Sequence, residues 1–152
     1  MCGPRRFGRG PFSRPLHYAV VVCRVSLLRP PGYHRAMLVL ENIISDRGSK
    51  YAVSGGPCRS DAEARAFLKE LKRNKKFAKA THNTWACLTE DGPLKNDDGE
   101  SGAGMVILRM LEREAVQNEI VVVTRWYGGK HLGGDRFRHV QEAVRLYLAE
   151  RG

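Results

Sequence analysis

The run Ile120–Thr124 constrains the fold more than any other part of the sequence, because it contains three consecutive valines. β-branched side chains favour extended backbone, and a strand that is apolar on both faces has to be covered on both sides or deeply buried. The run therefore predicts a central strand. A chain of 152 residues has the size of one domain, so the remaining elements are expected to pack around this strand.

Two segments have the apolar period of an amphipathic helix. The first is expected to begin at Ser60, whose hydroxyl can cap the helix, with Glu63 completing a capping box. Its apolar stripe is Ala64, Phe67, Leu68 and Leu71. The second is Arg136–Glu150, with Asp135 placed as its cap. Its stripe is Phe137, Val140, Val144 and Leu148.

Three further segments complete the expected domain. Met105–Leu111 is apolar on nearly every side, which indicates a helix buried against a sheet. Lys50–Val53 is typical of a strand that stops at a turn, Gly55–Gly56–Pro57. Thr84–Thr89 predicts another strand, followed by a loop at 90–93. Helices on a mixed sheet in this order predict a two-layer α+β domain.

The formal net charge of +10 is unevenly distributed along the chain. The first 40 residues contain seven arginines and no acidic residue, so they account for +7 and the other 112 residues for +3. A dedicated nucleic-acid-binding domain carries its excess charge on its own surface. The distribution therefore argues against nucleic-acid binding as the main role of the folded body.

Residues 1–36 are rich in Arg, Pro and Gly, which argues against packed structure there. A secretory signal and a mitochondrial transit peptide are the alternatives to a disordered extension, and the composition favours the extension. The folded domain is then 37–152. No apolar run reaches the roughly 18 residues of a membrane span, so we expect a soluble protein. We further expect it to be cytoplasmic and monomeric. The cysteines at 2, 23, 58 and 87 are widely separated, which predicts free thiols.

An acidic turn at Asp97–Glu100 is the first candidate site, with His82 and Asn83 upstream. Its carboxylates could provide the hard oxygen ligands of a divalent metal. Acidic residues ahead of a helix also bind the free amides of its first turn. Because a helix is expected just downstream, we favour capping over a metal site.

A glycine-rich loop between the valine strand and the last helix is the second candidate. It contains Arg125, Trp126, Tyr127 and Lys130 and ends at Asp135. Backbone amides at a glycine-rich turn before a helix can bind an anion. The alternative is a structural loop whose aromatic residues pack on the domain, and the sequence leaves both open. The basic residues Lys75, Lys76 and Lys79 are expected at the end of the first helix, facing solvent.

Several of these segments together resemble the IMPACT family, in order and in spacing, over roughly 40–150. The matching segments are Lys79–Asn83, Asp97–Glu100, Ala103–Gly104, Val121–Gly129, Leu132–Gly133 and Asp135–Phe137. The segments at 125–129 and 135–137 resemble the eukaryotic branch. Two features differ from it: Lys130–His131 stands where an aliphatic pair is typical, and only residues 1–36 stand where eukaryotic members carry an RWD domain.

The resemblance implies a fold like the second domain of ribosomal protein S5 and domain IV of elongation factor G. It implies a translational regulator that competes for the ribosome-associated activator of the general-control kinase, which phosphorylates initiation factor 2 during amino-acid starvation. Family members have also been linked to monomeric actin, and the family offers no catalytic residues, metal or cofactor to transfer.

We therefore expect a non-enzymatic module whose partner-binding residues lie together at one edge of the domain. They are His82, Asn83, Asp97, Asp98, Glu100, Arg125, Trp126, Tyr127, Lys130, Asp135 and Arg136. Two alternatives stay open. One is RNA or ribosome binding through Arg125, Lys130, His131 and the lysines at 75, 76 and 79. The other is a metal-dependent hydrolase using His82, Asp97, Asp98 and Glu100.

Overall fold

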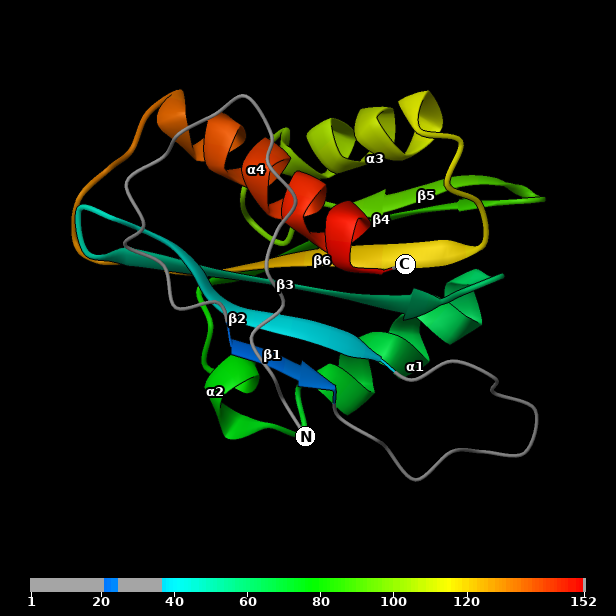
Figure 1. The fold of residues 1–152 in the computed structure, drawn as a ribbon, viewed down its shortest axis with the longest axis horizontal. Coiled ribbons are helices and arrows are strands. Elements are labelled where there is room, and N and C mark those ends of the chain that lie inside the picture. The colour runs from blue at the N-terminus through cyan, green and yellow to red at the C-terminus, as the bar shows by residue number, and fades with distance from the viewer. Residues whose placement is uncertain (1–20, 25–36, 152) are drawn as a thin grey trace.

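The computed structural model describes residues 37–151 and the backbone of 21–24 (Figure 1). Six strands form one sheet in the order β1-β2-β3-β6-β4-β5, and every neighbouring pair is antiparallel. The strands are β1 (Val21–Arg24), β2 (Leu38–Asp46), β3 (Ser49–Pro57), β4 (His82–Thr89), β5 (Gly92–Asn96) and β6 (Glu119–Trp126). The helices are α1 (Asp61–Leu71), α2 (Lys75–Ala78), α3 (Ala103–Arg113) and α4 (Asp135–Glu150).

The valine run lies in β6, between β3 and β4, which confirms the predicted central strand. Successive side chains of a strand point to opposite faces of the sheet. Val121 and Val123 belong to the core beneath α3 and α4. Ile120 and Val122 belong to a second core, shared with α1 and α2. Three valines in a row are therefore compatible with this strand because both of its faces are buried.

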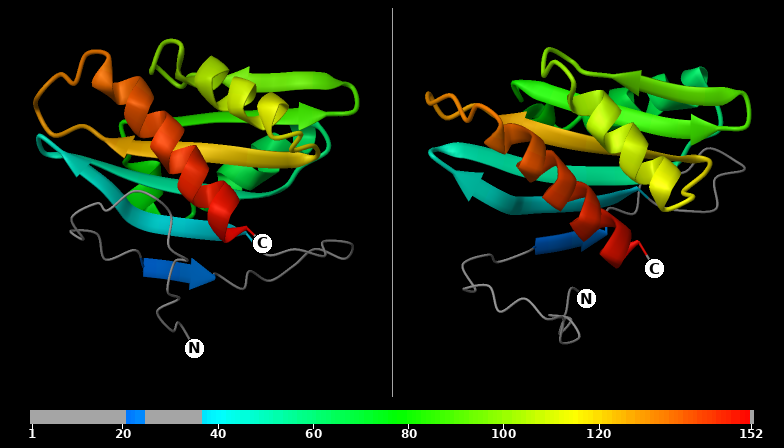
Figure 2. Two further views of the ribbon diagram at one scale, coloured as in Figure 1. Left: turned by 45° about the horizontal axis from the view of Figure 1, so that its top comes forward. Right: turned by 90° about the horizontal axis from the view of Figure 1, so that it is seen from above.

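Helices cover both faces of the sheet, and the α+β class is confirmed (Figures 1 and 2). The long helix α4 and its neighbour α3 lie side by side on one face. The shorter α1 and α2 lie on the other face, where Ala64, Leu71 and Phe77 are buried. The predicted two layers correspond to the sheet and the pair α3 and α4. Helices α1 and α2 form a partial third layer on the other face, which the prediction did not include.

The start of α1 follows the predicted capping. The Ser60 hydroxyl accepts a hydrogen bond from the Glu63 amide at 3.2 Å. The Glu63 carboxylate in turn accepts from the amide of Arg59, one residue before the cap, at 2.6 Å. The helix ends at Leu71, and Asn74 caps the separate helix α2. The lysines at 75 and 76 therefore belong to α2, so their predicted place at the end of the first helix is wrong.

Two predictions about the other helices also need correction. Asp135 does not cap α4: it is the first helical residue, and Gly134 stands at the cap without a side-chain hydrogen bond. The Asp135 carboxylate instead binds the guanidinium groups of Arg47 and Arg138. Helix α3 packs against the sheet as predicted, but it is not buried on nearly every side, since Met105 is 37% exposed. The sheet and α4 cover only part of this helix, which leaves the rest in solvent.

Glycine and proline misled the prediction of two strand ends. Gly55, Gly56 and Pro57 continue β3 rather than forming a turn. Gly55 is required there because the Tyr147 ring packs on it, and a Cβ would lie 2.3 Å from a ring carbon. The expected loop at 90–93 is a tight turn, and Gly92 already begins β5.

The predicted extension at 1–36 lies mostly outside the described residues. Val21–Arg24 is the described exception and pairs with β2 as β1. Of the four cysteines, Cys58 and Cys87 are free and buried. Cys2 and the side chain of Cys23 lie outside the described part. None of the helices in the described ranges is long and apolar enough to cross a membrane.

Candidate functional site

The candidate residues meet where the end of β6 adjoins the start of β4. In the register of this pair, Arg125 lies opposite His82 and Thr124 lies opposite Asn83. Because side chains alternate along a strand, His82 and Arg125 point to the face of α3 and α4. Asn83 and Trp126 point to the face of α1 and α2. The structure therefore brings the predicted residues to one end of the sheet but divides them between its two faces.

A buried ion pair is the centre of the first face. The Arg125 guanidinium donates to the Glu100 carboxylate at 2.6 Å, and their side chains are only 6% and 3% exposed. The guanidinium carbon lies 5.8 Å from the ring centre of Tyr51 and 5.7 Å from that of Tyr127. A buried charge requires an opposite charge close by. The pair therefore fixes the acidic turn, which carries Glu100, to the end of β6.

His82 and Asp98 connect β4 to the same turn. The His82 Nδ1–H donates to the Asp98 carbonyl at 2.8 Å, and Nε2 lies 3.9 Å from a Glu100 carboxylate oxygen. The Asp98 carboxylate accepts a hydrogen bond from the backbone amide of Asn83 at 2.7 Å. A Cβ at Gly99 would lie 3.2 Å from the imidazole Nδ1, so this position favours glycine for its space and for its φ of +86°.

Asp97 holds the start of α3. Its carboxylate accepts from the amides of Gly102 at 3.0 Å and Gly104 at 2.8 Å. The Gly102 hydrogen bond, with that of Gly104, keeps the pKa of the Asp97 carboxyl below its usual value. This geometry agrees with the capping interpretation of the acidic turn.

The oxygen atoms that a metal site would need are engaged in these contacts. Both oxygens of Asp97 accept amide hydrogens, and Glu100 is paired with Arg125. Among the described residues, no three His, Cys, Asp or Glu side chains converge where they could hold a metal ion. The acidic turn at Asp97–Glu100 is thus held in place by contacts within the protein.

Trp126 supports α2 on the other face of the sheet. Its indole N–H donates to the Lys76 carbonyl at 3.0 Å, and its ring meets Phe77 edge to face at 5.4 Å between centres. The Asn83 side chain donates to the Phe77 carbonyl at 3.1 Å and accepts from the Thr124 hydroxyl at 2.8 Å. Trp126 and Asn83 therefore have structural partners and help to hold α2 to the sheet.

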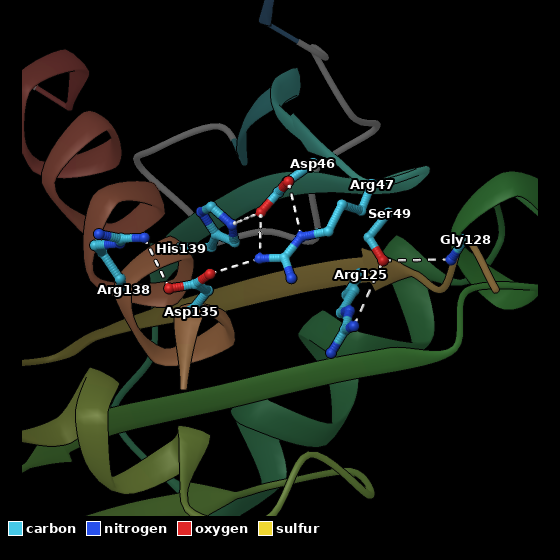
Figure 3. A network of polar contacts seen from close by, with 8 residues as sticks. All are labelled: Asp46, Arg47, Ser49, Arg125, Gly128, Asp135, Arg138 and His139. Atoms are coloured by element: carbon cyan, nitrogen blue, oxygen red, sulfur yellow. Dashed lines mark hydrogen bonds and ion pairs between the residues drawn. The ribbon is translucent and has the colours of Figure 1, made fainter. Parts of the chain in front are cut away.

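The glycine-rich loop is fastened where it leaves β6. The Tyr127 amide donates to the Thr81 hydroxyl at 2.8 Å. Figure 3 shows the second contact, in which the Gly128 amide donates to the Ser49 hydroxyl at 3.3 Å. Arg125 also donates to Ser49, at 3.4 Å. Gly128 packs directly on the turn between β2 and β3, where a Cβ would lie 2.0 Å from the Gly48 carbonyl carbon. No larger residue fits at Gly128 without moving this turn.

The outer part of the same loop faces solvent. Tyr127 is 41% exposed, and its ring centre lies 5.6 Å from that of His131. Lys130 is exposed beside them. Leu132 is buried and fastens the second half of the loop to the core beneath α4. The loop thus presents an aromatic and cationic tip on a base that is held at both ends.

The start of α4 carries a charged network that the sequence did not indicate. Asp46, at the end of β2, accepts from His139 at 2.8 Å and from Arg47, which also donates to Asp135 at 2.5 Å (Figure 3). The hydrogen bonds from His139 and Arg47 lower the pKa of the Asp46 carboxyl. Asp46 and His139, like Arg47 and Asp135, are about 90 positions apart along the chain, so no local pattern could reveal these pairs. Arg136 stacks on the ring of Phe137 at 4.7 Å.

Together, these features define a sheet-and-helix domain with one rigid polar end. His82, Asp98, Glu100, Arg125 and Tyr127 form a connected group there. Lys130 lies on the loop, and Asp135 and Arg136 are the first residues of α4. Asp97 lies before α3 and accepts a hydrogen bond from the Gly104 amide in its first turn.

Comparison with known proteins places this domain in a family. The Impact N-terminal domain model matches residues 47–148, and the chain belongs to the IMPACT family. It is 40% identical over 114 residues to Protein IMPACT of Homo sapiens, covering 71% of this chain and 36% of that protein. It is 38% identical over 116 residues to the Protein IMPACT homolog of Caenorhabditis elegans, covering 71% and 45%. The chain spans less than half the length of these relatives.

One solved structure shows the same fold. A crystal structure of a hypothetical protein superposes with a TM-score of 0.65 at 22% identity, covering 74% of this chain and 57% of the other. The structure of the two-domain translational regulator Yih1 aligns at 27% identity and a TM-score of 0.45, covering 93% and 54%.

Proposed function

We propose that this chain is a non-enzymatic, cytoplasmic regulator of translation that acts by binding another protein. The partner is the ribosome-associated activator of the general-control kinase, and occupying that activator restrains the kinase during amino-acid starvation. Membership in the IMPACT family supports the assignment to translational control. Monomeric actin is a second protein partner to examine.

One observation carries the proposal: the exposed aromatic side chain of Tyr127 projects from a loop whose start is held by hydrogen bonds to Thr81 and Ser49. Tyr127 follows the last residue of β6, and its ring centre lies 5.7 Å from the guanidinium of Arg125, whose buried pairing with Glu100 fixes the end of that strand. Aromatic residues contribute most to binding when the surface that carries them is already ordered, since less entropy is then lost on association. We therefore place the docking surface at Tyr127, Lys130 and His131 and extend it to the exposed Asp98, whose carbonyl binds His82 at the same end of the sheet.

The test is a binding titration with the purified activator and two matched variants. Tyr127→Ala and Met105→Ala each remove a large apolar side chain of similar exposure, 41% and 37%, from different elements. We expect Tyr127→Ala to weaken binding by about tenfold or more, which is the size of an interface anchor. Met105→Ala is expected to bind as the wild type does. Equal affinities of all three proteins would reject this surface.

Trp126→Ala is a poorer test than the sequence indicated. Because the indole binds the Lys76 carbonyl and packs on Phe77, removing it disturbs α2 before any partner is present. A loss of binding in that variant would therefore report folding as much as recognition.

RNA or ribosome binding is the second candidate, and the α1–α2 side favours it. Residues 59–79 contain eight basic and three acidic residues, a net +5 within a body that totals +3 beyond residue 40. These residues lie on the face opposite α3 and α4, and α2 meets the residue before the loop, Trp126. Binding through phosphate contacts releases counterions and weakens steeply with salt. Salt-insensitive association would exclude this mode.

A further inference from the structure

Two buried thiols meet under the start of α1, at the other end of the sheet from the glycine-rich loop. Cys58 follows β3 and lies two residues before the α1 cap Ser60. Cys87 is in β4, opposite Ile120 at the start of β6. Both side chains are fully buried in the core shared with α1 and α2. The proposed docking surface uses neither of them.

The contacts bring the two residues within reach of a covalent bond. The Cys87 thiol donates to the carbonyl oxygen of Cys58 at 3.4 Å, and the Cys58 thiol donates to the carbonyl of Ser60, also at 3.4 Å. The Cys87 sulfur therefore lies against the main chain of Cys58, and the two thiols also shift each other's pKa through a side-chain hydrogen bond. Adjacent thiols of this kind are what a disulfide needs, provided that the two Cα atoms can come to about 4.4–6.8 Å.

We propose that Cys58 and Cys87 are a site of oxidative modification and close to an intramolecular disulfide when the folded protein meets a small disulfide oxidant. The step is two thiol–disulfide exchanges. The Cys58 thiolate attacks one sulfur of the oxidant, forms a mixed disulfide and releases the first thiol. Cys87 then attacks the Cys58 sulfur and releases the second. The protein loses two electrons and two protons, and the oxidant is reduced to two thiols.

The two thiols are unequal, which gives the exchange its order. The hydrogen bond from Cys87 lowers the pKa of the Cys58 thiol, whereas its hydrogen bond to Cys58, together with burial, raises the pKa of the Cys87 thiol. Cys58 therefore attacks first and Cys87 resolves the mixed disulfide. Cys58 also adjoins the exposed Arg59, so fraying at the start of α1 is enough to admit a small oxidant.

Closure would link the end of β3 to β4 across the intervening β6. The base of α1 would then be joined covalently to the sheet. Because the bond closes a long segment of chain, it limits the unfolded ensemble more than the native one. We therefore expect the oxidised protein to melt at a higher temperature than the reduced protein.

The experiment oxidises the folded chain with oxidised glutathione, with and without a low concentration of urea. Remaining thiols are alkylated, the chain is digested without reduction, and the peptides are identified by mass spectrometry. Peptide mapping separates a bond between Cys58 and Cys87 from any bond that uses Cys2 or Cys23. We expect a peptide pair joined at Cys58 and Cys87, lighter by two hydrogen atoms, formed faster with urea.

Two controls make the result decisive. Cys58→Ala should abolish the joined peptide and leave Cys87 open to alkylation after digestion. Melting of the oxidised and the reduced wild type is compared in parallel. If Cys58 and Cys87 are recovered as separate alkylated peptides under both conditions, or if oxidation lowers the melting temperature, the native positions do not favour the bond and the proposal is wrong.

Discussion

Removing the Glu100 carboxylate should destabilise the fold more than any other single truncation at this end of the sheet. In Glu100→Ala, the buried Arg125 guanidinium loses its 2.6 Å partner. Within the described residues it keeps the hydrogen bond to the Ser49 hydroxyl at 3.4 Å and the rings of Tyr51 and Tyr127 at 5.8 and 5.7 Å. Its Nε is buried without a hydrogen-bond partner already. The variant therefore leaves a positive charge in the core with little compensation.

The expected cost follows from that geometry. Breaking a buried pair by removing one partner costs about 3–5 kcal/mol, because the remaining charge stays out of water. A domain of this size has a total stability of about 5–15 kcal/mol, so the loss is a large part of it. Replacing both residues by apolar ones, as in Glu100→Leu with Arg125→Met, removes the unpaired charge. We expect that double variant to recover most of the loss.

Urea unfolding followed by circular dichroism measures these differences directly. The matched control is Arg65→Ala, which removes an arginine that is 78% exposed and paired with Asp61 at 2.8 Å. An exposed pair contributes about 1 kcal/mol or less. If Glu100→Ala costs no more than the control, the buried pair does not hold the acidic turn. If the double variant is as unstable as Glu100→Ala, the loss reflects packing and not the stranded charge.

Two further substitutions test the same end of the molecule. Gly128→Ala should lower the melting temperature, because its Cβ would lie 2.0 Å from the Gly48 carbonyl carbon. Gly134→Ala is the control and should melt as the wild type does, since its Cβ would have no neighbour within 4 Å among the described residues, apart from those adjacent in the chain. Equal melting temperatures of the two variants would show that the loop does not need the close approach at Gly128. Asp97→Asn should cost stability at pH 7 and progressively less as the pH is lowered: the folded pKa of Asp97 lies below 3.8, so its contribution is present above 3.8 and is lost as the pH falls through the folded pKa. A cost that does not decrease with pH in urea titrations would show that the charge on Asp97 contributes nothing.

The parts of the fold that the sequence predicted are those with a strong local period. The valine run of β6, the capped helix α1 and most of α4 follow from patterns within a few residues. Strand β5 was missed because Gly92, Pro93 and Lys95 are typical of loops. The end of β3 was not predicted because Gly55 is required by a distant contact and not by a turn. Its missing side chain leaves room for the ring of Tyr147 in α4, which is more than ninety positions later in the chain.

The candidate site shows the same division between local and distant information. Asp97 capping α3 was predictable because donor and acceptor are close in the chain. Assigning Arg125 and Trp126 to one surface was an error that strand alternation could have prevented, since neighbours in a strand face opposite ways. The pairing of Asp46 with His139 depends on the docking of α4 against the β2–β3 turn and has no local signal.

Backbone amide NMR with the purified activator fragment tests the docking surface most directly. If that surface is correct, adding the fragment shifts or broadens the amide signals of 127–134 and of His82 and Asp98, while those of α1 (Asp61–Leu71) stay in place. Changes centred on 59–79, with the tip of the loop unaffected, would place recognition on the opposite face and contradict the proposed surface.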